Sequence, residues 1–426
     1  MDGWSWPLIF RDLGRYYEAD RQNGAPGIEP TCSYRRYIEW LDGRAAGESE
    51  SFWRLALRGL KCPTPLEFSP DPARNPVSDE RFAVEIVQLS VEDTGRLQAF
   101  CREHQLTLNT LVQAAWAMLL GHVSGQEDVV FGAAFSGRPA EIPGIESMVG
   151  PCVNNVPIRV GLRGSEPFVG WLAEVQQSQF AVSEHQYVPL HTIQDCSDVP
   201  PRFRLFDSLL VFQNYGADEA TRRLGSTLSI EPLSSPDATN YPLTLVVDPG
   251  SALRLKLMHP RNRFDGAEIG SLLRELGVLL VNCAHSGGKR LADVMGTLSP
   301  QTKGMAARRR RVVGAAPSGG GAPASEMERK VAAIWQDLFE VDSLSFDENF
   351  FDLGGHSLLL LRAHQRLRET VRGDLSIVAM LQHPTIRTLA RHLSGVEKGS
   401  AAFDAIRERA RRQRAAFSPR RGATTK

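Results

Sequence analysis

The spacing of hydrophobic residues divides this chain of 426 residues into a long mixed part and a shorter helical part. Apolar residues recur at helical spacing within residues 8–60, which predicts helices on both sides of a Gly/Pro-rich break. Residues 82–280 alternate strand-like and helical segments, and the uniformly apolar run Leu108–Leu120 predicts a buried helix. Strands are predicted at Phe82–Leu89, Val129–Gly132, Val156–Val160, Ser208–Phe212 and Leu243–Val247. The pattern as a whole is typical of an α/β domain.

The rest of the chain, residues 301–426, has a different pattern. Residues 301–324 combine an arginine run with Gly, Pro and Ser, a composition that predicts a flexible linker. Residues 325–396 contain four short apolar stripes, which predict a small all-α four-helix bundle. Residues 397–426 form a basic tail. This tail is interpreted with equal weight either as a helix that docks on an acidic partner surface or as a frayed, solvated end of the chain.

Composition limits the classes of partner. The charges of the 49 basic and 49 acidic residues cancel, and a net charge of zero argues against a nucleic-acid partner. The six cysteines show no C-x-x-C spacing, so neither a zinc site nor a disulfide framework is predicted, and a reducing cytoplasm fits best. The N-terminus lacks the apolar core of a signal peptide, and the apolar runs are too short to span a bilayer. We therefore expect no metal and no membrane contact.

A serine in the helical part is the best-supported candidate site. The segment Asp347–Leu359 resembles the attachment motif of peptidyl carrier domains. Gly354 and Gly355 permit a tight turn, and Ser357 is predicted at a helix N-terminus, where free N–H groups favour a phosphodiester. The alternative is that Ser357 is an ordinary helix N-cap. The neighbouring His356 is interpreted as a surface element for partner recognition rather than as a base.

The resemblance implies a cofactor and partners for this serine. In the carrier family the serine receives 4′-phosphopantetheine from coenzyme A, and the thiol of the arm holds an aminoacyl or peptidyl thioester. A phosphopantetheinyl transferase would supply the activation, so Ser357 needs no base of its own. Phe350, Phe351 and Leu353 are expected to anchor the preceding loop to the bundle.

The first residues of the chain, Met1–Leu8, resemble the end of a second signature, His-His-x-x-x-Asp-Gly, from nonribosomal-peptide condensation domains. Asp2 and Gly3 match its last two positions, while no His-His pair occurs among the ten histidines. Further segments resemble the same family in the same order: Tyr34–Leu41, Ser51–Trp53, Ser136–Ile145, Met148–Arg159, His185–Leu190, Leu205–Tyr215 and Asn240–Leu243.

This second resemblance implies an incomplete condensation fold of the chloramphenicol-acetyltransferase type over residues 1–300. In the family the second histidine positions or deprotonates the attacking amine, and the aspartate makes a structural salt bridge. Asp2 is therefore expected to be structural, with a partner that the motif alone does not identify, and no catalytic residue is assigned in this chain. Asn154, Asn155 and the turn at Ser136–Arg138 are expected to be structural or to shape the tunnel.

Taken together, the motifs predict a fragment or subunit of a nonribosomal peptide, or hybrid peptide–polyketide, synthetase of secondary-metabolite or antibiotic biosynthesis. Because no adenylation domain separates the two parts, an adenylation enzyme acting in trans and upstream and downstream synthetase subunits are the expected partners. Whether the chain itself forms amide bonds stays open without the histidines. The alternatives are a non-catalytic scaffold that docks carrier domains and an acyltransferase that uses another histidine, such as His185.

Overall fold

The computed structural model forms two compact units, Met1–Ala316 and Pro317–Lys426, each described here by itself. The structure describes residues 1–28, 31–44, 46–66, 82–200, 203–213, 223–224, 228–229, 239–261, 263–303, 325–339, 341, 344–347, 350, 357–371 and 375–394. At 46, 223–224, 228–229, 357 and 358 it describes the backbone alone. Basic-tail residues 397–426 and residues 304–324 of the linker, for which predictions were made, lie outside this range.

The first unit is built on a six-stranded mixed sheet with the order β1-β8-β7-β4-β2-β3. Its strands are β1 (Phe82–Gln88), β2 (Asp128–Phe135), β3 (Asn154–Gly161), β4 (Ser208–Phe212), β7 (Leu243–Asp248) and β8 (Arg254–Pro260). The central pairs β2–β4 and β4–β7 are parallel, whereas β1–β8, β7–β8 and β2–β3 are antiparallel. Continuous apolar runs form the buried central strands, as expected for strands covered on both faces.

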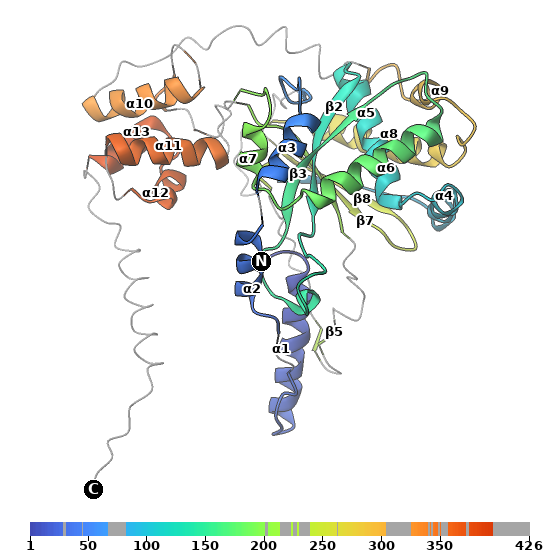
Figure 1. Cartoon of the computed structure of the whole chain (residues 1–426), viewed down its shortest axis with the longest axis horizontal. Helices are drawn as coiled ribbons and strands as arrows, with labels where there is room; N and C mark the ends of the chain where they lie inside the picture. Colours follow the sequence, from blue (N-terminus) through green and yellow to red (C-terminus); the bar gives the residue numbers. More distant parts are fainter. Residues whose placement is uncertain are drawn as a thin grey trace. The chain divides into compact units, whose positions relative to one another are not determined.

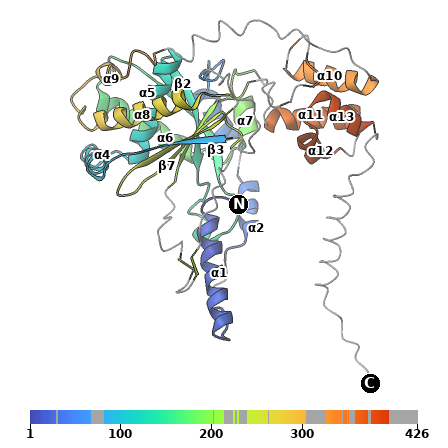
Figure 2. The same ribbon diagram turned by 180° about the vertical axis from the view of Figure 1, so that it is seen from behind.

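Long helices pack together against this sheet (Figures 1 and 2): α4 (Val91–Glu103), α5 (Leu108–Ser124), α6 (Phe168–Glu184) and α8 (Gly266–Cys283). The predicted buried helix is confirmed as α5, because every residue from Thr110 to Gly121 is buried. Thr107 caps its N-terminus and Gly125, with φ of 73°, ends it in the left-handed region. This unit also contains the short helices α7 (Leu190–Asp195) and α9 (Leu291–Met295) and a 3₁₀ turn (Ile145–Ser147).

Three helices precede the sheet in the chain: α1 (Ser5–Arg21), α2 (Tyr34–Asp42) and α3 (Ala46–Ala56). The helix α1 projects from the body of the first unit, near the small ribbon β5 (Arg223–Leu224) and β6 (Leu228–Ser229) (Figure 1). It exposes large apolar side chains, among them Trp6 at 47%, Leu13 at 52% and Tyr16 at 57%. An uncovered apolar helix face of this kind is typical of a surface that another polypeptide segment covers.

The second unit confirms the predicted helical bundle. Its helices are α10 (Glu326–Phe339), α11 (Ser357–Thr370), α12 (Ile377–Gln382) and α13 (Ile386–Leu393). Trp335, Leu359, Leu367 and Leu389 lie in one buried core, which the apolar stripe of each helix supplies. The bundle therefore closes a hydrophobic core of its own.

Within the described residues, no single helix is long and apolar enough to cross a membrane. The helices α4 and α5 meet the length and composition requirements only as a pair, across a bend of 104°. The described residues also contain no group of three or more His, Cys, Asp and Glu that could hold a metal ion.

Candidate functional site

The carboxylate of Asp2 is the centre of a buried polar network. The guanidinium Nη2 of Arg138 donates to both of its oxygens, at 3.1 Å (Oδ1) and 3.0 Å (Oδ2). Both side chains are nearly inaccessible, at 5% exposure for Arg138 and 2% for Asp2. Asp2 also accepts bonds from the Ser5 hydroxyl at 2.7 Å, the Ser5 N–H at 3.0 Å and the Cys152 N–H at 3.1 Å. The salt bridge expected for this aspartate is present, and its partner is Arg138.

Arg138 extends the network into the loop between β2 and β3. Its Nη1 donates to the carbonyls of Ile145 and Met148, at 2.7 and 2.8 Å. The turn that presents it needs glycine, because Gly137 has φ of 60° and an added Cβ would lie 1.8 Å from the Cys152 carbonyl oxygen. The network thereby ties the start of α1 to a loop more than 130 positions away in the chain.

Two tyrosines of α2 hold the far side of the same loop. The Tyr34 hydroxyl donates to the Pro151 carbonyl at 3.0 Å, and the Tyr37 hydroxyl donates to the Cys152 carbonyl at 3.3 Å. Burial raises the pKa of Tyr37 far above its ordinary value of 10.0 and also raises the pKa of the Cys152 thiol, which Arg138 partly offsets. These phenols and this thiol therefore stay protonated at neutral pH and act as structural groups.

His185 lies at the C-terminal end of α6, where it contacts α3. Its Nδ1 forms a hydrogen bond of 3.0 Å with the Ser49 hydroxyl, and its ring stacks on Phe52 with centroids 4.2 Å apart. The Trp53 indole donates to the His185 carbonyl at 3.1 Å. His185 and Arg138 line one open cavity of about 630 Å³. The contacts of His185 thus join two helices, and none of them involves Asp2.

The asparagines that follow this loop have structural contacts. The Asn154 amide donates to the carbonyls of Gln186 and Val188, at 2.6 and 2.9 Å. The Asn155 side chain forms a hydrogen bond with Tyr241. Asn154 therefore fixes the segment that presents His185, which agrees with the structural alternative for this pair.

In the second unit, Ser357 is the first residue of the 14-residue helix α11. The backbone thus places it at a helix N-terminus, as the motif predicts. The first N–H groups of a helix lack intrahelical acceptors and carry partial positive charge, so a phosphate ester on this residue fits the site. Phe351, Leu353, Gly354, Gly355 and His356, about which predictions were made, lie outside the described residues.

Phe350 is buried in the core of the second unit. Its buried ring packs against Trp335 and Phe339, with centroids 4.8 and 5.2 Å away. Its N–H donates to the Pro384 carbonyl at 2.6 Å. Phe350 therefore packs in the core of the bundle, which agrees with its predicted anchoring role.

The first unit is thus a mixed α/β domain with a buried Asp–Arg pair, and the second is a helical bundle with a serine at a helix start. Comparison with known families identifies both. The condensation-domain family matches residues 1–305, and the phosphopantetheine attachment site family matches residues 329–393. The chain belongs to the condensation-domain family and carries a phosphopantetheine attachment domain after it. Domains of the second family carry 4′-phosphopantetheine.

Curated relatives are components of peptide synthases. One of the linear gramicidin synthase proteins of Brevibacillus parabrevis is 40% identical over 303 residues, which are 69% of this chain and 6% of that protein. Chondramide synthase cmdD of Chondromyces crocatus is 33% identical over 405 residues, 94% of this chain and 10% of that protein. The chain thus spans only a small part of the relatives it matches.

Solved structures confirm the fold of the first unit. The X-domain from teicoplanin biosynthesis superposes with a TM-score of 0.58 at 24% identity, over 68% of this chain and 68% of that chain. The first condensation domain of the calcium-dependent antibiotic synthetase superposes with a TM-score of 0.53 at 16% identity. The match covers 69% of this chain and 64% of that chain. At these identities the likeness establishes the condensation fold and nothing about substrate.

Proposed function

We propose that Ser357 of this chain carries 4′-phosphopantetheine and tethers an aminoacyl or peptidyl thioester during nonribosomal peptide, or hybrid peptide–polyketide, synthesis. The observation that carries this proposal is the position of Ser357 at the start of α11, inside the range matched by the attachment-site family. The N-terminus of α11 would hold the phosphodiester, and the arm would supply the thiol that forms the thioester. The anchored Phe350 would fix where the loop presents the serine.

The first unit is proposed to serve amide formation between two carrier-bound substrates. In that reaction the amine of one substrate attacks the thioester carbonyl of the other and releases a thiol. Asp2 and Arg138 would act as positioning residues, since their buried salt bridge fixes the loop that follows the two histidines of the signature. The base itself would come from a segment that bears those histidines, for which the apolar face of α1 offers a contact surface.

We assign four segments to these roles. Residues 1–300 form the condensation part, 301–324 the linker, 325–396 the carrier domain and 397–426 a basic tail that could dock a partner. The two compact units and the two matched ranges support the first three. The expected partners are a phosphopantetheinyl transferase, an adenylation enzyme acting in trans, and neighbouring synthetase subunits.

Mass spectrometry tests the carrier assignment. Incubation of the full chain with coenzyme A and a broad-specificity phosphopantetheinyl transferase should add one phosphopantetheine group. Ser357→Ala should abolish the addition, whereas Ser394→Ala, in which only a hydroxyl at the end of α13 is lost, should leave it intact. A wild-type chain that stays unmodified, or a Ser357→Ala chain that is still modified, would contradict the assignment.

A second assay separates condensation from the alternative of a carrier-docking scaffold. With two loaded carriers, the chain should form no amide product alone, and product should appear when a polypeptide containing the His-His segment is added. Binding of carriers without product under both conditions would favour the scaffold. Amide formation by the chain alone would show that its base lies within residues 1–426.

A further inference from the structure

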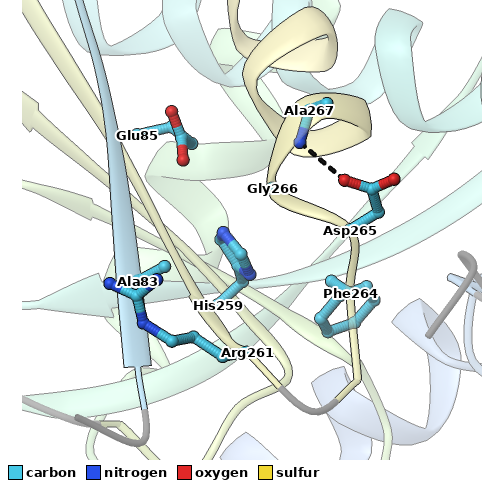
Figure 3. Close-up of a pocket in the computed structure, with 8 residues that line it drawn as sticks. All are labelled: Ala83, Glu85, His259, Arg261, Phe264, Asp265, Gly266 and Ala267. Carbon is cyan, nitrogen blue, oxygen red and sulfur yellow. Dashed lines mark hydrogen bonds between the residues drawn. The ribbon is translucent and has the colours of Figure 1, made fainter. Parts of the chain in front are cut away.

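A second cavity lies at the edge of the sheet far from the Asp2 network. It measures about 290 Å³ and is bordered by β1, the end of β8 and the start of α8 (Figure 3). Its lining consists of Ala83, Glu85, His259, Arg261, Phe264, Asp265, Gly266 and Ala267. In the sheet order, β1 and β3 are the two outer strands, and the loop with Arg138 follows β2 next to β3. The cavity is therefore separate from the site described above.

His259 is the most informative residue of this cavity. It pairs with Ala83 in the β1–β8 register, and only 1% of its surface is exposed. The carbonyl of the adjacent Pro260 lies near the ring, yet within the described chain neither ring nitrogen reaches a partner in hydrogen-bond geometry. Buried polar groups almost always have a partner in the protein or in bound molecules. The buried imidazole therefore offers its ring nitrogens as hydrogen-bonding groups to a molecule bound in the cavity.

Glu85 presents a partly exposed carboxylate to the same space. Its carboxylate lies beside the first turns of α8, since Cβ atoms added to Gly266 and Gly270 would be 3.5 and 3.4 Å from its oxygens. It makes no hydrogen bond or ion pair with any residue that the structure describes. Figure 3 shows the carboxylate and the His259 ring facing the same space. Together they offer acceptors to a cationic, hydrogen-bond-donating group.

The start of α8 offers a donor beside Glu85. The side chain of Asp265 caps α8 by accepting from the Ala267 N–H at 2.8 Å, the bond drawn in Figure 3. The Gly266 N–H, at the positive end of an 18-residue helix, has no acceptor among the described residues. Arg261 lines the space from the β1 side, where its Nε donates to the Phe82 carbonyl at 3.3 Å. These donors favour a negatively charged group such as a carboxylate.

We propose that this cavity binds a small free α-amino acid, with its ammonium group on Glu85 and His259 and its carboxylate at the start of α8. A ligand whose opposite charges are two bonds apart matches a cavity in which acceptors and donors lie close together. The cavity is also far larger than the about 10–15 Å³ of probe-occupied volume that one water requires. This site goes beyond the proposed condensation and carrier functions.

Isothermal titration calorimetry of the full chain with glycine and L-alanine tests the proposal. At least one of the two should bind, and ethanolamine and acetate, which each carry only one of the two charged groups, should bind at least about tenfold more weakly. Glu85→Gln and His259→Phe should each weaken amino-acid binding by at least about tenfold, because the first removes the negative charge that faces the ammonium group and the second removes an acceptor nitrogen. Glu103→Gln, an exposed carboxylate on α4, is the matched control and should bind as the wild type does.

Three results would overturn the site. Glycine and L-alanine could both give no binding heat, as for a cavity filled only by water. Ethanolamine or acetate could bind as tightly as the amino acids. Glu85→Gln and His259→Phe could both leave binding unchanged. Circular dichroism would verify that each variant is folded, and Glu85→Gln alters only a partly exposed side chain, so it decides the matter even if His259→Phe is unstable.

Discussion

Replacing Arg138 by Met should strongly destabilise the first unit. The substitution removes both charged hydrogen bonds to Asp2 and the two bonds to the Ile145 and Met148 carbonyls, at a site with 5% exposure. Breaking a buried ion pair from one side costs about 3–5 kcal/mol, since the remaining charge is left without a counter-charge. Because the Ser5 and Cys152 donors still bind the carboxylate, we expect the lower end, about 3 kcal/mol.

Urea unfolding followed by tryptophan fluorescence measures this loss. Trp335 is the only tryptophan after residue 317, so a Trp335→Phe background confines the signal to the first unit of the full chain. Asp2→Asn alone should also destabilise the first unit. In the Arg138→Met/Asp2→Asn double variant, the loss of unfolding free energy should be smaller than the sum of the two single losses by about 1–2 kcal/mol, because Asp2→Asn removes the carboxylate charge that Arg138→Met leaves without a counter-charge.

The exposed ion pair between Arg96 and Glu92 provides the control, with side chains at 49% and 74% exposure. Arg96→Met should cost no more than about 0.5 kcal/mol. If Arg138→Met costs less than about 1 kcal/mol, or if its effect adds fully to that of Asp2→Asn, then this salt bridge does not hold the loop.

Further predictions concern other parts of the chain. Gly137→Ala should destabilise the first unit by at least about 2 kcal/mol in urea unfolding, from left-handed strain and the clash with the Cys152 carbonyl, whereas Gly95→Ala, on an open helix face, should stabilise it by about 0.5–1 kcal/mol. Phe350→Ala should cost the carrier unit about 3–5 kcal/mol by Trp335 fluorescence and slow phosphopantetheine addition. Burial lowers the pKa of His259 below its ordinary 6.5, so the unfolded chain binds this proton more tightly and stability should fall as pH drops below about 6.5. His259→Phe should reduce that fall between pH 7.5 and 5.5 in urea midpoints, and an unchanged fall would contradict the stated cause.

The local pattern of apolar and polar residues was sufficient to predict most of the helices and strands. The strand predictions at Ser208–Phe212 and Leu243–Val247 coincide with β4 and β7 to within a residue, and the apolar run from Leu108 lies in α5. The strand β8 was not predicted, although Arg254–Pro260 alternates polar and apolar residues in a way that indicates a strand. Its alternation is the signal that would have found it.

The sequence by itself determined the helical bundle, the position of Ser357 at a helix start and the family to which each of the two parts belongs. These features depend on residues close to one another in the sequence. Only the tertiary structure decided that Arg138 is the partner of Asp2 and that Glu85 and His259 face one cavity. Those pairs lie 136 and 174 positions apart in the chain. Their contact depends on strand order and register, which no local periodicity records.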